Sequence, residues 1–323
     1  MPRMKKLQKL EGSQNIKLVE DDIPVPRQDE VLVEVKRSLI SRGTELFNHV
    51  VPERAGLTRG LGYSDSGIVV QVGDQVSGLA IGDRASMLSP HAQYVAGSLK
   101  EGGKAFPLPD DMSYDTATFI PLAGGAVAWT QAPPMEPGDT VVVNGQGIVG
   151  NLCAQAVRIR QPGQVITIDA LDMRCRISRQ CAADEVINVS ETDSVQAVMD
   201  LTDGKGADVV FECVGGSSGG GAFEQALRMV RKNGVLHLVA LFQGRPLSLD
   251  SKEAAGKMII TSYFRSLSRL ERSKIAVDMI MDGSFKIDPL ITHRPSWVEA
   301  DHIHNMLYEN PDRMLGVVLQ WDQ

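Results

Sequence analysis

The stretch Val141-Val-Val-Asn-Gly145-Gln-Gly147-Ile-Val-Gly150 joins an apolar run to three glycines at the spacing Gly-x-Gly-x-x-Gly. The valines are typical of a buried strand, and residues 148–158 have helical spacing. In such a turn Gly145 permits a sharp bend, Gly147 lets the backbone approach a pyrophosphate, and Gly150 lets helix and strand pack closely. The N–H groups and positive dipole end of the helix would then face the phosphate.

The next predicted strand, Val165-Ile-Thr-Ile-Asp169, ends in an acid. Asp169 lies 19 positions after Gly150 (169 − 150), close to the ~20 expected for the carboxylate that binds the ribose. An Asp here accepts hydrogen bonds from the 2′-hydroxyl of NAD and repels a 2′-phosphate, which predicts NAD(H) in preference to NADP(H). Further candidates for cofactor binding are Ile148, Val149, Arg174, Val214, Gly215 and Ala240.

The pattern of strands changes along the chain. The first third contains short, alternating apolar segments such as residues 31–35 and 67–72, which indicate a small, curled β domain. From Asp139 onward, strands such as residues 208–212 and 235–239 are separated by stretches long enough for a helix. Strands that alternate with helices predict a parallel sheet.

Charge and composition exclude several classes of function. The chain has 323 residues, 33 basic and 40 acidic side chains and a net charge of −7, so neither nucleic acid nor an acidic membrane surface is an expected partner. The basic segment Met1 to Leu10 has no apolar core, and no apolar run reaches the ~20 residues of a membrane span. The four cysteines have no metal-ligand spacing and read as free thiols in a reducing cytoplasm.

Four segments together resemble one known family. Ser41-Arg-Gly-Thr-Glu45 is similar to a Cys-Gly-Thr-Asp motif, and residues 61–69 are similar to a Gly-His-Glu stretch. Residues 72–84, which end in Gly-Asp-Arg, are similar to a glycine-containing turn of the same family. Residues 315–319 are similar to the strand near the end of its members. With the glycine motif, they resemble the medium-chain dehydrogenase/reductase superfamily, on its alcohol-dehydrogenase-like side.

The resemblance implies an α/β fold with two domains. A Rossmann domain with a doubly wound parallel sheet would span residues 121–263. A β-rich, chaperonin-10-like catalytic domain would combine residues 1–120 and 264–323. The active site is expected in the cleft between the two domains.

The chain departs from the zinc-dependent members of that family. Arg42 stands where they have Cys, Tyr63 where they have His, and Ile120 or Pro121 at the third ligand position. Residues 84–104 hold no cysteine for a structural zinc. Since none of these side chains is a usual zinc ligand, the sequence predicts a zinc-independent member with no metal.

Without zinc, the developing alkoxide needs another partner. Arg42 offers a permanent charge, and Tyr63 offers a phenol whose pKa a guanidinium would lower. By resemblance Thr44 is a proton-relay hydroxyl, and His49 is a candidate to pass a proton to solvent. Structural interpretations stay open: Arg42 pairs with Glu45 or Asp65, Tyr63 fills a vacated pocket, and His49 is a solvated loop residue.

The expected function is NAD(H)-dependent interconversion of a secondary alcohol and a ketone, in a branch that acts on hydroxyl groups in natural-product biosynthesis. Two alternatives remain. One is an enone or quinone reductase of the same fold, and the other is a non-catalytic nucleotide-binding protein. A homodimer is expected through an edge strand near Lys257-Met-Ile-Ile-Thr261, because an apolar edge left exposed would aggregate.

Overall fold

The structure is a computed structural model that describes residues 2–12, 16–45, 58–100, 102–241, 246–261 and 267–322. The chain divides into two compact units. Unit 1 comprises Met1–Pro121 and Ile291–Gln323, and unit 2 is Leu122–Leu290. Unit 1 is therefore discontinuous in sequence, and unit 2 is a single insertion within it.

Unit 2 contains a six-stranded sheet in which every neighbouring pair is parallel. Its strands are β9 Thr140–Asn144, β10 Gln164–Asp169, β11 Glu185–Asn188, β12 Ala207–Glu212, β13 Val230–Leu238 and β14 Met258–Thr261. They lie in the order β11-β10-β9-β12-β13-β14, so the chain reverses direction across the sheet between β9 and β12. Ligands of open α/β sheets bind at the carboxyl ends of the strands at this reversal.

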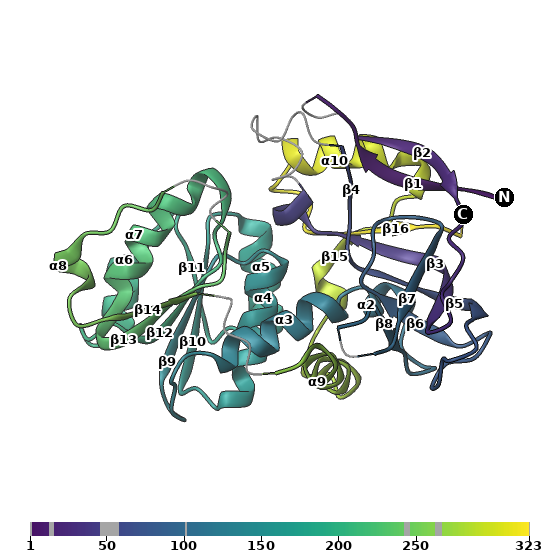
Figure 1. Cartoon of the computed structure of the whole chain (residues 1–323). Coiled ribbons are helices and arrows are strands. Elements are labelled where there is room, and N and C mark those ends of the chain that lie inside the picture. Colours follow the sequence, from purple (N-terminus) through teal and green to yellow (C-terminus); the bar gives the residue numbers. More distant parts are fainter. Residues whose placement is uncertain are drawn as a thin grey trace. The chain divides into compact units, whose positions relative to one another are not determined.

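Helices cover both faces of that sheet, with α4 and α5 together on one side and α6 and α7 on the other (Figure 1). The helices of the unit are α3 Ile120–Gln131 (which begins at the boundary), α4 Ile148–Ala156, α5 Asp172–Cys181, α6 Ser194–Leu201, α7 Gly219–Met229, α8 Ser251–Ala254 and α9 Arg269–Met281. The described residues of the unit also form the short 3₁₀ segments Val157–Arg160, Gly216–Ser218 and Asp288–Leu290. Alternate strand residues such as Val142, Ile166 and Leu236 pack against Phe223 and Leu227 of α7, as period-2 alternation requires.

The second boundary between the units falls after Leu290, whereas the sequence suggested residue 264. The reason is that the segment after α9 is bound to unit 2. The amide of Gln155 on α4 pairs with the backbone of Lys286, accepting from its N–H at 2.6 Å. The first turn of α9 also lies close to α3, since a Cβ at Gly124 would be 3.3 Å from the carbonyl oxygen of Arg272.

Unit 1 is built from two curled sheets. The strands are β1 Arg3–Lys9, β2 Ile16–Asp22, β3 Glu30–Ile40, β4 Arg59–Gly60, β5 Asp65–Val72, β6 Arg84–Met87, β7 Tyr94–Ser98, β8 Ala105–Pro107, β15 Ile291–His293 and β16 Gly316–Gln320. The larger sheet has the order β15-β16-β3-β5-β6-β8, with β7 also paired to β3, and the smaller has the order β2-β1-β4. Val31, Val33 and Val35 of β3 point into the core between them. Besides a helical turn at residues 42–45, the described part of the unit contains the helices α2 Tyr114–Ala117 and α10 Ala300–Glu309. The 3₁₀ turn Trp297–Glu299 precedes α10.

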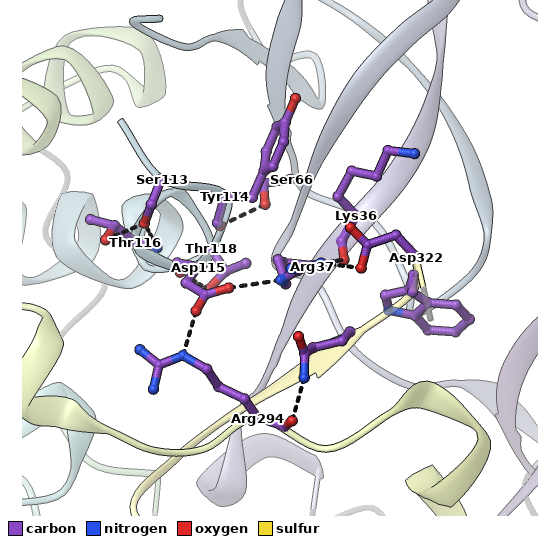
Figure 2. A network of polar contacts seen from close by, with 12 residues as sticks. Lys36, Arg37, Ser66, Ser113, Tyr114, Asp115, Thr116, Thr118, Arg294 and Asp322 are labelled. Carbon is purple, nitrogen blue, oxygen red and sulfur yellow. Dashed lines mark hydrogen bonds and ion pairs between the residues drawn. The ribbon is translucent and has the colours of Figure 1, made fainter. Parts of the chain in front are cut away.

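A charged network ties the two sequence segments of unit 1 together (Figure 2). The carboxylate of Asp115 on α2 accepts from Arg37 of β3 at 2.8 Å and from Arg294, just after β15, at 2.5 Å. Arg37 also bonds Asp322 at 2.5 Å. Arg37 and Asp115 are mostly buried, so these pairs fix the carboxyl-terminal segment against β3 more firmly than exposed pairs would.

The α/β fold expected from the sequence is therefore confirmed, with a parallel sheet in one unit and a curled β-rich arrangement in the other. The glycine-rich residues 215–221 include a 3₁₀ turn and the start of α7. Among the described residues, no helix has the length and apolar character that crossing a bilayer requires.

Candidate functional site

The glycine turn between β9 and α4 has the geometry of a phosphate-binding loop. Gly145 has a φ of 92°, and a side chain there would meet Val214 at 2.7 Å. A Cβ at Gly150 would lie 1.7 Å from the carbonyl oxygen of Gly145, so no other residue fits that position. At Gly147, by contrast, a Cβ would meet nothing within 4 Å. The first and third glycines thus shape the turn, and the second leaves the space above it clear.

That clear space lies at the amino terminus of α4, where Gly147 is the N-cap residue. The N–H groups of the first helical turn, including those of Ile148 and Val149, have no partner within the helix. Ile148 is buried and Val149 is half-buried. The residues present fit the diphosphate of a nicotinamide dinucleotide. The space beside Gly147 is open only because this residue has no side chain, and the N–H groups around that space can donate to an anion.

Asp169, the last residue of β10, is held firmly beside this turn. Its carboxylate accepts from the backbone N–H of Gln146 at 2.7 Å and of Leu171 at 2.9 Å. The guanidinium of Arg174, from the first turn of α5, lies 3.5 Å from the same carboxylate. Arg174 is mostly buried rather than an exposed helix residue. The predicted ribose acid and its basic neighbour are therefore brought together next to Gly145.

The ends of β12 and β13 form the other side of the turn. Val214 and Gly215 follow β12, and a Cβ at Gly215 would lie 3.7 Å from the side chain of Ala240, which follows β13. The buried carboxylate of Glu212 accepts from the amide of Asn144 and from the N–H of Val214, both at 2.7 Å. Burial raises the pKa of Glu212 to about 8. Glu212 is a residue of this edge that sequence reasoning did not select.

In unit 1, Tyr63 and the segment of residues 41–45 form a cluster of hydroxyl groups. The phenol of Tyr63 donates to Oγ of Ser41 at 2.7 Å and also interacts with Thr44. Thr44 is exposed, so the cluster reaches the surface of the unit. Burial, with the nearby carboxylate of Glu45, raises the pKa of Tyr63. The expectation that a guanidinium would lower this pKa was wrong.

Arg42, the other candidate for substrate chemistry, is half-buried in the helical turn of residues 42–45. Its Nε donates to the carbonyl oxygen of Leu307 on α10 at 3.3 Å. This contact at the carboxyl-terminal end of a helix is favourable for a cation. The fourth candidate, His49, lies outside the described residues.

The three positions that bind catalytic zinc in the resembled family do not fit the ion. A guanidinium at Arg42 repels a dication, and the Tyr63 phenol remains protonated. Ile120, the first residue of α3, is buried and apolar, and the neighbouring Pro121 has no ligand atom. No chemical step is therefore assigned to a metal at these positions.

A different set of metal-type ligands does exist in unit 1, which corrects the expectation that the chain has none. Glu45, His91 and His304 are all buried, and one ligand atom from each lies within 4.8 Å of the others. The Nε2 atom of His304 lies 2.9 Å from the carboxylate of Glu45, and that of His91 lies 3.2 Å from it. The two imidazoles hold the pKa of Glu45 at about 2, against the effect of burial. The prediction of zinc independence is thus not supported.

These two histidines carried no local signal in the sequence. His91 is 46 positions from Glu45, and His304 is 259 positions from it. His304 lies between the apolar residues Ile303 and Leu307 on the buried face of α10. A single histidine in such a segment predicts a core residue and not a metal ligand. Contacts between distant parts of the chain, such as the pairing of β16 with β3 and the packing of α10 against β2, bring the two sequence segments of the unit together.

The fold and the glycine turn define an architecture of two units, one with a parallel sheet of the kind that binds nucleotides and the other rich in β-strands. Comparison with known proteins relates this architecture to particular enzymes. Residues 149–280 match the family described as zinc-binding dehydrogenase. Over 324 aligned positions the chain is 28% identical to L-threonine 3-dehydrogenase of Pyrococcus furiosus, covering 90% of this chain and 91% of that protein. It is 26% identical to sorbitol dehydrogenase of Bacillus subtilis, covering 75% and 76%.

A solved structure of an Escherichia coli oxidoreductase/dehydrogenase of unknown specificity superposes with a TM-score of 0.88 at 20% identity, covering 100% of both chains. That likeness shows the fold. Together with the family match and the relatives, it supports the relation of the chain to the zinc-type alcohol-dehydrogenase-like superfamily. The relatives are dehydrogenases, which supports an oxidoreductase.

Proposed function

We propose that the protein is a nicotinamide-dependent dehydrogenase that interconverts a secondary alcohol and a ketone, with NAD(H) as its cofactor. The observation that carries this proposal is the turn of Gly145, Gly147 and Gly150, which leaves a clear approach to the amino terminus of α4. The relatives named as threonine and sorbitol dehydrogenases support an alcohol as the substrate. When bound, the nicotinamide ring accepts or supplies the hydride.

The residues of unit 1 supply the proton transfer that accompanies this chemistry. In the reductive direction Tyr63, protonated at neutral pH, gives its proton to the developing alkoxide. Ser41 and Thr44 hold the phenol, and the exposed Thr44 connects it to solvent. Arg42 contributes a permanent positive charge that stabilises the alkoxide.

The test is a turnover assay of the purified chain with NADH or NADPH and a panel of ketones, enones and quinones, with products identified by mass spectrometry. An alcohol product supports the proposal. A saturated ketone instead identifies an enone reductase. Cofactor binding without turnover of any compound identifies a non-catalytic nucleotide-binding protein.

The cofactor preference depends on the pair Asp169 and Arg174. We expect wild-type protein to bind NADH more tightly than NADPH, because the carboxylate of Asp169 repels a 2′-phosphate. Asp169→Asn removes the charge and leaves Arg174 to attract that phosphate. The preference should therefore shift toward NADPH by about 10- to 100-fold, the scale of charge-assisted hydrogen bonds. Fluorescence titration with both cofactors at one ionic strength measures it.

The double variant Asp169→Asn/Arg174→Gln is the control, and it should lose the gain for NADPH. Equal affinity of the wild-type protein for both cofactors would contradict the role of Asp169.

We also propose that the chain forms a homodimer through β14. This strand ends the six-stranded sheet, and Met258 on it is 49% exposed. An edge strand left open invites pairing with another chain. Light scattering should return twice the chain mass of 35.0 kDa, and a mass equal to one chain would refute the dimer.

A further inference from the structure

The buried cluster of Glu45, His91 and His304 has no part in the function proposed above. Glu45 belongs to the helical turn described at residues 42–45, His91 lies between β6 and β7, and His304 is on α10. Both histidine side chains are 0% exposed, and that of Glu45 is 2% exposed. Three ionisable groups removed from water in this way need a specific reason to remain together.

The hydrogen bonds of His304 determine where its ring proton sits. Its Nδ1 lies 2.6 Å from the carbonyl oxygen of Ala300, and a carbonyl only accepts, so Nδ1 carries the proton. The Nε2 atom then presents a lone pair to the ionised carboxylate of Glu45 at 2.9 Å. Two lone pairs at this separation repel unless a cation lies between them. That cation is either a second ring proton or a metal ion.

His91 is anchored in the same manner. Its Nδ1 lies 2.8 Å from Oγ of Ser38, and the direction of this hydrogen bond depends on the ring tautomer. The same Oγ accepts from the indole N–H of Trp321 at 2.8 Å. Its Nε2 lies 3.2 and 3.3 Å from the two oxygens of Glu45. Gly62, with a φ of 87°, makes room for this ring, since a Cβ there would be 2.6 Å from it. Anchoring of Nδ1 while Nε2 faces the ion is the pattern of metal-bound histidines.

A neighbouring acid supports the interpretation. Asp65 is buried, and its Oδ1 has no hydrogen-bond partner among the described residues. This oxygen lies 3.9 Å from Nδ1 of His91. Carboxylates commonly stand behind metal-bound histidines, where they accept from the second ring nitrogen.

The distances to Glu45 differ for the two rings: 2.9 Å from Nε2 of His304 is the length of a hydrogen bond, whereas 3.2–3.3 Å from Nε2 of His91 is long for one. One proton can bridge only one of the two imidazoles to Glu45. Two zinc ligands, each ~2.0–2.1 Å from the ion in a tetrahedron, lie roughly 3.3 Å apart. The separations between His91 and Glu45 have this length, and two imidazoles with one carboxylate form a known zinc donor set.

We propose that Glu45, His91 and His304 together bind a divalent transition-metal ion, with Zn²⁺ as the ion to test. The site is separate from Arg42, Tyr63 and Ile120, the positions that the resemblance assigned to zinc. Because Glu45 also accepts from the N–H of Ser41 at 2.7 Å, the ion would fix the segment that holds the Tyr63 phenol. It would join residues from both sequence segments of unit 1.

The experiment measures metal binding directly and does not depend on turnover. The full chain is purified without chelators or nickel columns, and its metals are counted by mass spectrometry. We expect about one Zn²⁺ per chain. After removal of the metal, added Zn²⁺ should raise the melting temperature in proportion to the logarithm of its free concentration. Added Co²⁺ should give the visible bands of an ion bound by imidazole.

The matched variants lie on the same helix. His304→Gln should weaken Zn²⁺ binding by at least ~100-fold. Loss of a residue that only hydrogen-bonds to a metal ligand typically costs 10- to 100-fold, and loss of a ligand itself should cost more. His302→Gln, at an exposed position two residues away, should bind as the wild-type chain does. If His304→Gln does not fold, Glu45→Gln, which keeps the side-chain shape, takes its place.

Three results would overturn the proposal. These are wild-type protein without metal, a melting temperature that does not respond to Zn²⁺, and equal Zn²⁺ affinity in His304→Gln and His302→Gln. Any of them would identify the cluster as a buried set of polar contacts among Glu45, His91 and His304 that holds no metal. Another first-row divalent metal found at one per chain would support the site.

Discussion

Replacing Tyr63 with Phe is expected to reduce the rate of ketone reduction by about 10²- to 10⁴-fold, the range for loss of a positioned general acid. The substitution removes only the hydroxyl that donates to Ser41, so the ring keeps its packing. The KM for the cofactor should hardly change, because Tyr63 belongs to unit 1 and the glycine turn to unit 2. Initial rates with a ketone that the wild-type protein reduces provide the measurement.

The pH dependence of the reduction rate is a second test of Tyr63 as the proton donor. The pKa of Tyr63 is raised above its ordinary value of 10.0, so the phenol keeps its proton below that pH. Reduction should therefore not decline through loss of this proton between neutral pH and about 10. Tyr308→Phe, at a residue of α10 that is 45% exposed, is the control. Near-normal turnover of Tyr63→Phe would leave Tyr63 as a packing residue.

Replacing Gly147 with Val is expected to weaken NADH binding by about 10²-fold or more while the chain still folds. The new side chain would enter space in which no protein atom lies within 4 Å of the Cβ. It would, however, keep the diphosphate from the N–H groups at the start of α4. Each lost charge-assisted hydrogen bond is worth about 1.5–3 kcal/mol, so one or two account for the effect.

Substitutions at two other glycines serve as controls for Gly147→Val. Gly221→Val on the exposed start of α7 also meets open space, and it should bind NADH normally. Gly150→Ala should damage the turn itself, lowering the melting temperature, because its Cβ would overlap the backbone of Gly145. Unchanged NADH affinity in Gly147→Val would mean that the cofactor does not bind across this turn.

The sequence was sufficient to predict the sheet of unit 2, for a physical reason. Buried parallel strands must be apolar throughout, and the turn at Gly145 requires glycine, so both leave a local pattern. The boundary near residue 264 was less well predicted because a helix such as α9 has the same pattern in either unit. Its contacts with unit 2, such as that of Lys286 with Gln155, are visible only in three dimensions.

The candidate site was predicted unevenly. Resemblance led to Arg42 and Tyr63, but the direction of the pKa shift of Tyr63 was predicted wrongly. Burial and the charge of Glu45 raise this pKa, and they outweigh the hydrogen bonds to Ser41 and Thr44. The histidines near Glu45 were missed because ligands were sought only at positions matching the family pattern. Ligands that come from distant segments of the chain have no characteristic spacing in the sequence, so no local motif predicts them.

The position of β16 also affects how the protein is made on the ribosome. Residues Arg37–Ile40 of β3, which lead directly into Ser41, pair with β16 rather than with β7. At about 5–20 residues per second, roughly 15 to 55 s pass between synthesis of these two strands. During this time unit 2 is able to fold on the nascent chain, while that half of β3 has an open edge of the kind that chaperones shield. The segment that carries the hydroxyl cluster is therefore among the last to reach its native surroundings.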